Sequence, residues 1–172
     1  MSVRHGLASI GLCACLGAAL LGHTQAPSSK PAQKEPVLTR HATGTFEVKT
    51  TPLPADDATA GTAIGRYGID KQFHGDLEGV SKGEMLGAGS QAKGTAGYVA
   101  IEQVTGTLHG HSGSFALQHF GAMDGGKFNL NVVVVPGSGA GDLAGIVGTM
   151  KIIIANGKHS YEFEYTLPEP SK

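Results

Sequence analysis

The chain has 172 residues, 27 of them glycine, and a formal net charge of -1 at pH 7. This near-neutral balance, without a block of lysine and arginine, excludes a basic nucleic-acid-binding surface, so no nucleic acid is expected as a partner. The length suits one domain with a real hydrophobic core. Glycine at roughly twice its usual share of about 7%, with no collagen period and few helix-favouring runs, indicates twisted β structure.

The first 26 residues have the composition of a secretory signal peptide. A short positive start (1–5) precedes an apolar run (6–22), and Thr24 and Ala26 occupy the positions expected before a cleavage site. A membrane anchor is the alternative, but the run is short, contains four glycines and is followed by no stop-transfer pattern. We therefore expect a periplasmic or secreted protein with no membrane span in its mature form.

Both cysteines, Cys13 and Cys15, lie inside this segment. Cleavage after Ala26 would leave a mature chain with no cysteine for a disulfide, a zinc site or a thiol nucleophile. The tetrapeptide "LCAC" also resembles a lipobox that would lipidate Cys15. This interpretation is less favoured, because apolar residues follow the cysteine where a polar tether is expected.

The rest of the chain divides by composition. Residues 27–41 contain three prolines and no apolar period, which predicts a flexible leader. The segment 42–168 is predicted to be the β-barrel domain, and 169–172 a C-terminal tail.

Alternation of apolar and polar residues predicts eight strands in the barrel domain. The predicted strands cover residues 42–50, 63–73, 76–88, 97–108, 113–123, 127–135, 141–154 and 158–167. Turns containing glycine, proline, asparagine or aspartate join them. The prolines beyond the leader, at 52, 54, 136, 168 and 170, are expected outside every strand interior, since proline cannot donate to a ladder.

A weak repeat, Gly-x-Leu-x-Gly, occurs at residues 75–79, 106–110 and 141–145. Gly75, Gly79, Gly83 and Gly87 share one parity, so one face of that strand is nearly bare of side chains. Bare faces let a sheet coil tightly enough to close. The sequence therefore predicts an all-β fold, a closed eight-stranded antiparallel up-and-down barrel.

Three stretches together resemble a bacterial family catalogued as domain of unknown function 3224. They are "IDKQFHGDLEGVSKGEML", "GYVAIEQVTGTLHGHSGSFALQH" and "GKHSYEFEYTLP". The resemblance runs from about Gly44 to Pro168 and implies a barrel of the allene oxide cyclase type, with an arginine expected where this chain has His111. The family carries no assigned activity, and no catalytic motif of the plant cyclases aligns with this chain.

The stretch "GTLHGHSGSF" places His109 and His111 two positions apart, a spacing that can chelate a metal. A firm site needs further ligands, and His119 lies at the far end of the next strand, roughly 20 Å away at about 3.3 Å per residue. We therefore predict an exposed polar hairpin, no metal and no cofactor. The glycine-rich loops lack the Gly-Lys-Ser/Thr ending of a phosphate loop.

Polar residues interrupt three otherwise apolar strand faces. Lys71 shares its face with Tyr67, Ile69 and Phe73; Glu102 with Tyr98, Ala100 and Val104; and His119 with Phe115 and Leu117. An unpaired buried charge costs several kcal/mol. The hypothesis is that Lys71, Glu102 and His119, with Tyr98 beside them, converge near one mouth of the barrel. The alternative is that bulges swap the faces or that Lys71 reaches a rim, so that these side chains never meet.

Three function classes follow. A closed eight-stranded barrel can hold a small apolar or amphipathic ligand, and this is the favoured reading. The second class is a cofactor-free isomerase or cyclase, in which Glu102 or His119 transfers a proton and Tyr98 donates. The third is a barrel filled by its own side chains that acts through its surface.

Overall fold

The computed structural model describes residues 38–168 of the chain. The predicted signal peptide, the predicted leader as far as Val37 and the predicted tail at 169–172 lie outside the described residues. The barrel domain begins with a strand at Thr39, slightly before the predicted boundary at Ala42.

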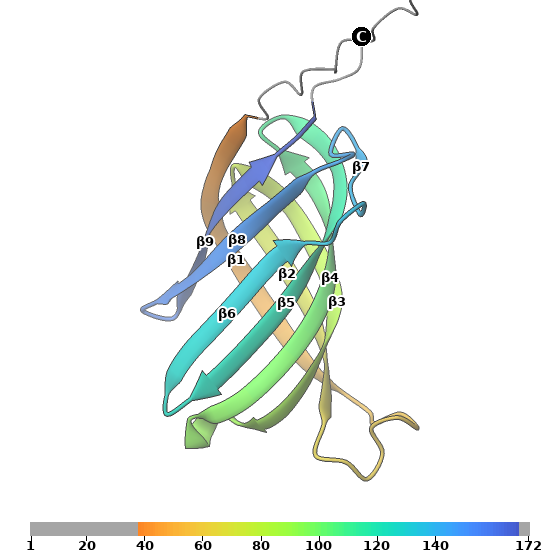
Figure 1. Ribbon diagram of the computed structural model, residues 1–172, viewed down its shortest axis with the longest axis vertical. Helices are drawn as coiled ribbons and strands as arrows, with labels where there is room; N and C mark the ends of the chain where they lie inside the picture. The colour runs from red at the N-terminus through yellow and green to blue at the C-terminus, as the bar shows by residue number, and fades with distance from the viewer. Residues whose placement is uncertain (1–37, 169–172) are drawn as a thin grey trace, which may run out of the picture. The chain divides into compact units, whose positions relative to one another are not determined.

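The described residues form β-strands and one short 3-10 helix. The strands are β1 (Thr39–Leu53), β2 (Gly65–Gly75), β3 (Leu77–Ser90), β4 (Thr95–Leu108), β5 (His111–Asp124), β6 (Lys127–Val134), β7 (Ala140–Gly141), β8 (Val147–Ala155) and β9 (Lys158–Thr166), with η1 (Gln91–Lys93) between β3 and β4. Figure 1 shows how they follow one another. Between residues 38 and 168 no helix has the length and apolar character needed to cross a membrane.

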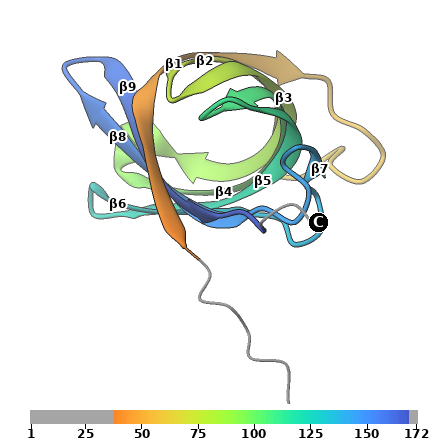
Figure 2. The same ribbon diagram turned by 90° about the horizontal axis from the view of Figure 1, so that it is seen from above.

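Eight of these strands close into an antiparallel barrel. Neighbouring strands follow the order β4-β3-β2-β1-β9-β8-β6-β5, and an additional pairing of β4 with β5 joins the two ends. Seen from above, the strands form a ring (Figure 2). The thinnest seam lies between β6 and β8, where a single residue pair, Val133 with Thr149, is in register. The predicted closed eight-stranded antiparallel barrel is confirmed.

The segment predicted as one strand over 141–154 is instead two short pieces. Ala140 and Gly141 form β7 against β5, a turn covers 142–145, and β8 begins at Val147. Gly141 and Gly145 have positive φ values of 66° and 78°, a conformation that interrupts a strand. The third copy of the glycine repeat is therefore a turn, not a strand.

The predicted exclusion of proline from strands fails at Pro52, which lies in β1 opposite Tyr67 of β2. The strand tolerates it for a local reason. β9 pairs with β1 only as far as Phe46, so the other edge of β1 is unpaired around Pro52. A residue without an N–H can stand at such an edge without losing a ladder hydrogen bond.

The buried core residues fill one end of the barrel, which is the upper end in Figure 1. This filled half contains large residues that are almost completely buried: Phe73, Leu77, Leu108, Phe115, Leu117, Leu143, Ile146, Met150, Tyr161, Phe163 and Tyr165. Leu143 and Ile146 enter this core from the turn after β7. Tyr161 and Tyr165 of β9 point inward, while Glu162 and Glu164 between them are exposed.

The opposite end is not filled. There the inward positions of β3 are the small or flexible residues Gly83, Met85 and Gly87, each only partly buried. The β1–β2 loop and the β3–β4 and β5–β6 connections lie at this lower end in Figure 1. The barrel therefore has a packed half and an open half.

Candidate functional site

Three of the predicted interior residues meet inside the barrel. Lys71 comes from β2, Glu102 from β4 and His119 from β5, and each points inward because it shares the parity of the core residues on its strand. Lys71 Nζ lies 2.6 Å from Glu102 Oε1, and His119 Nε2 lies 2.9 Å from the same oxygen. Bulges do not swap these faces.

A fourth member, Ser81 of β3, was not singled out from the sequence. Its hydroxyl donates to Glu102 Oε2 at 2.7 Å, and its side chain is buried. Ser81 lies opposite Lys71 in the β2–β3 ladder, and the parity of β3 places it inward with Leu77 and Met85. Both carboxylate oxygens of Glu102 are therefore engaged by neighbours on three other strands.

Glu102 is completely buried, yet it stays ionised. Burial alone would raise its pKa. The hydrogen bond from His119 and the nearby charge of Lys71 outweigh burial and lower the pKa of Glu102 from 4.5 to about 2. Across residues 38–168, no fully buried side-chain nitrogen or oxygen lacks a hydrogen-bond partner. The cluster thus meets the condition for burying charge, which is a paired and hydrogen-bonded network.

Lys71 is also held by aromatic rings. Its Nζ lies 5.0 Å from the centre of the Phe46 ring and 5.8 Å from that of Phe73. Such contacts stabilise an ammonium by about 0.5–2 kcal/mol, more where water is excluded. Lys71 does not extend to a rim of the barrel, since only 8% of the residue is exposed.

Tyr98 lies beside this cluster without a hydrogen bond to it. It shares the inward face of β4 with Glu102, and burial together with the negative charge of Glu102 raises the pKa of Tyr98 to about 12. Its ring stacks on Phe128 of β6 with the centroids 6.4 Å apart. Tyr98 is therefore a wall of the open half and keeps its phenol proton at neutral pH.

A cavity of about 230 Å³ adjoins the cluster on the side of the open half. Lys71 and His119 form part of its floor, whereas Glu102 does not reach it. The other lining residues are mostly apolar: Phe46, Val48, Thr50, Ile69, Met85, Tyr98, Phe128, Leu130, Ile152, Ile154 and His159. An apolar cavity with a few convergent polar groups is the usual form of a small-molecule site.

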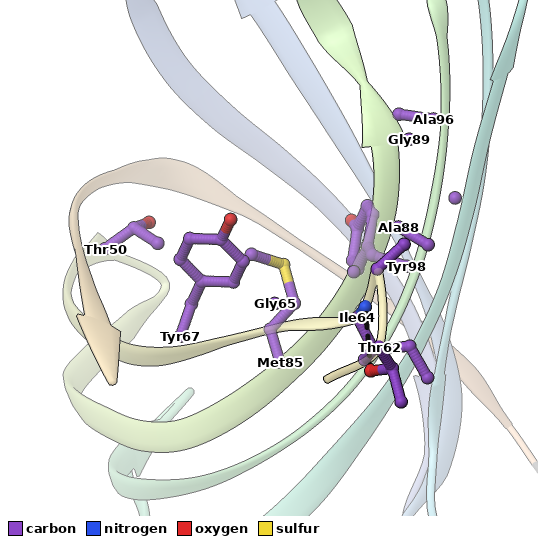
Figure 3. A pocket seen from close by; sticks show the side chains of 13 residues that line it. Thr50, Thr62, Ile64, Gly65, Tyr67, Met85, Ala88, Gly89, Ala96 and Tyr98 are labelled. Atoms are coloured by element: carbon purple, nitrogen blue, oxygen red, sulfur yellow. Dashed lines mark hydrogen bonds between the residues drawn. The ribbon is translucent and has the colours of Figure 1, made fainter. Parts of the chain in front are cut away.

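A wider depression of about 720 Å³ forms the mouth of the open half. It shares Thr50, Met85 and Tyr98 with the inner cavity. Figure 3 shows the side chains of Tyr67 and Met85 between Thr50 and Tyr98. The two spaces therefore adjoin, and the Lys71–Glu102–His119 cluster lies at the inner limit of the open half instead of at the mouth as predicted.

The histidine pair of the β4–β5 turn has separate partners at the filled end. His109 Nδ1 lies 2.8 Å from the Tyr165 hydroxyl, and Nε2 lies 3.6 Å from Asp76 Oδ1. His111 Nε2 lies 3.3 Å from a guanidinium nitrogen of Arg40. Among residues 38–168, no group of three or more histidine, cysteine, aspartate or glutamate side chains is arranged to hold a metal ion.

Comparisons with known proteins agree with the fold. A search of curated proteins gave no match. A solved structure of a protein with unknown function from the DUF3224 family of Shewanella oneidensis MR-1 is 52% identical, with a TM-score of 0.70, and the match covers 78% of this chain and 100% of that one. The family model "Protein of unknown function (DUF3224)" matches residues 42–165. The likeness to allene oxide cyclases stays a prediction, but the chain belongs to the DUF3224 family.

Proposed function

We propose that this protein binds a small amphipathic molecule in the open half of its barrel. The observation that carries the proposal is the pairing of an apolar cavity with a polar floor made by Lys71 and His119. The apolar part of the ligand would lie against Val48, Ile69 and Ile152, and its polar head would face the floor. Each methylene group buried in such a site contributes about 0.8 kcal/mol.

The geometry supports binding better than catalysis by Glu102. A general acid or base must come within hydrogen-bond reach of the reacting proton. Glu102 is completely buried, does not line the cavity and uses both carboxylate oxygens within the cluster. Its low pKa also makes it a weak base. Glu102 is better suited to positioning Lys71 and His119 than to exchanging protons with a ligand.

The test is the binding of a neutral apolar fluorescent probe, N-phenyl-1-naphthylamine, to the purified protein. The Val48→Trp variant fills the cavity from β1 and should weaken probe binding at least tenfold. Val80→Trp is the matched control, because Val80 is 45% exposed on the outer wall of β3; it should bind like the parent. Equal binding by both variants, or no binding by the parent, would contradict the proposal.

Export is part of the same proposal. A signal peptide over 1–26 would place the mature N-terminus near Pro27 and the protein in the periplasm or outside the cell. Mass analysis of the protein from the periplasmic fraction should give a chain that begins there. An intact Met1, or a lipid on Cys15, would contradict export by this route.

A further inference from the structure

We infer that the ligand's polar head is a carboxylate, which binds between Lys71 and His119 together with one proton taken up by His119 Nδ1. This inference rests on the proposed function and specifies its ligand class. It follows from the hydrogen-bonding capacity and charge that the cluster leaves available to the cavity.

Lys71 has donors to spare. An ammonium group carries three N–H donors, and Glu102 Oε1 is the acceptor that the described residues provide for Nζ. The remaining neighbours of Nζ are the rings of Phe46 and Phe73. Because Lys71 lines the cavity floor while being almost completely buried, a ligand oxygen there would satisfy a donor that water reaches poorly.

His119 presents an acceptor to the same cavity. The ionised carboxylate of Glu102 can only accept, so the Nε2 atom that lies 2.9 Å away carries the hydrogen. In the neutral ring Nδ1 then holds a lone pair, and no residue between 38 and 168 is hydrogen-bonded to it. His119 lines the cavity and is 3% exposed. Nδ1 is therefore the atom of the floor that can take a proton.

The proton on His119 Nδ1 is needed to balance the charge of a bound carboxylate. Where His119 is neutral, the positive Lys71 and the negative Glu102 cancel before a ligand binds. A carboxylate that entered alone would leave one uncompensated negative charge in an apolar, buried space, which costs several kcal/mol. Protonation of His119 restores neutrality: the imidazolium donates from Nε2 to Glu102 and from Nδ1 to the ligand. The nearest oxygen of the ligand also accepts from Lys71.

Other titratable groups lie around His119 and its cavity. Tyr98 on β4 keeps its proton, since its pKa is raised to about 12. His159 on β9 lines the same cavity and packs against Phe46, with ring centroids 5.1 Å apart and the ring planes tilted by 38°. The inward residues of β6, Leu130 and Val132, carry no charge. Lys71 on β2 and Glu102 on β4 complete the set.

The experiment is calorimetric titration of the protein, expressed from its full reading frame, with octanoic acid and with 1-octanol. Octanoic acid should bind at least tenfold more tightly than the alcohol at pH 6. Titrations in two buffers of different ionisation enthalpy should give an uptake close to one proton per ligand near pH 7. By linkage the Kd should then rise by up to tenfold per pH unit. A Kd independent of pH, with no proton uptake, would overturn the inference.

His119→Gln separates proton uptake from folding. The glutamine amide can still donate to Glu102 but takes up no proton, so the variant should lose the uptake and at least tenfold in affinity for octanoic acid. Its affinity for 1-octanol should be unchanged. His74→Gln is the matched control, because His74 is an exposed histidine that does not line the cavity. Parent-like uptake by the His119→Gln protein would refute the role of Nδ1.

The role of the Lys71 ammonium is tested in a variant that lacks the charges of both Lys71 and Glu102. Lys71→Met alone would leave Glu102 buried without its cation, so it is combined with Glu102→Gln. This double variant should bind 1-octanol but show no preference for the acid. A preserved preference would overturn the role of Lys71. Binding of the probe and the alcohol without any preference for the acid in the parent would leave the proposed function standing and reject this inference alone. Absence of all binding would reject both.

Discussion

Gly83 of β3 lies directly opposite Glu102 of β4, so closely that a Cβ atom at position 83 would come within 2.6 Å of both Cα and Cβ of Glu102. The missing side chain therefore lets the two strands approach where the charged residue turns inward. The bare glycine face that the sequence predicted is the interior face of the wall, and at Gly83 it makes room for the cluster.

Gly83→Ala should destabilise the protein. The added methyl group would meet backbone atoms, including the carbonyl oxygen of Ile101, which cannot move without opening the β3–β4 ladder. Overpacking of this kind costs about 1–3 kcal/mol. Gly68→Ala is the control, since its Cβ would meet nothing nearer than 3.8 Å. Urea unfolding should show a loss for the first variant and none for the second; equal midpoints would contradict the prediction.

The pairing of Lys71 with Glu102 predicts strongly non-additive mutational effects. Lys71→Met should cost about 3–5 kcal/mol of unfolding free energy, because it leaves a buried carboxylate without its cation. Adding Glu102→Gln should recover most of that loss, since the unpaired charge is gone. A double-mutant cycle from urea unfolding measures the coupling. A coupling energy near zero would mean that the two residues do not interact as the structure describes.

Acid should lower the unfolding free energy of the parent protein, because Glu102 becomes protonated. Its pKa is lower in the folded protein, about 2, than its ordinary value of 4.5, so the ionised form is favoured by folding. This contribution, on the order of 3 kcal/mol, is complete above about pH 5 and is lost as pH falls from 4.5 towards 2. The Lys71→Met/Glu102→Gln variant should show a flatter stability profile in that window.

Measuring the acid stability profiles of the parent and this double variant in high salt isolates the contribution of Glu102. Asp56, Asp76 and Glu78 also have lowered pKa values, mainly through local hydrogen bonds, but they lie at the surface, where 0.5 M sodium chloride screens charge. The buried network of Glu102 is screened far less. Parallel acid profiles for the parent and the double variant in salt would refute a special contribution from Glu102.

The strand faces explain why the site could be predicted in part. A period of two residues places Lys71, Glu102 and His119 among apolar neighbours, so each stands out as a polar residue on a buried face. Whether these three side chains meet depends on the register of β2, β3, β4 and β5. The sequence of a single strand does not reveal that register. Ser81 went unnoticed because it stands between Gly79 and Gly83, where no apolar pattern marks the inward face.

The division into a filled and an open half could not be predicted from strand patterns. Leu143 and Ile146, which help to fill one end, lie in a segment that was predicted as strand and is a turn. The repeat predicts Gly141 and Gly145 on a strand face, but Gly141 ends the two-residue strand β7 and Gly145 lies in the turn that follows, both with positive φ values. Glycine is compatible with either conformation, so its spacing alone does not distinguish a bare strand face from a turn.

The β4–β5 turn should remain indifferent to metal. Zinc ligation needs an available nitrogen lone pair on each histidine and further ligands around it. His111 Nε2 is already the acceptor beside the Arg40 guanidinium, whose positive charge opposes a cation, and His109 contacts Tyr165 and Asp76. Neither a chelator nor stoichiometric zinc should shift the melting temperature by more than about 1 °C, since only a ligand that binds the folded state raises it. A rise with zinc that disappears in His111→Ala would show that the turn does bind metal.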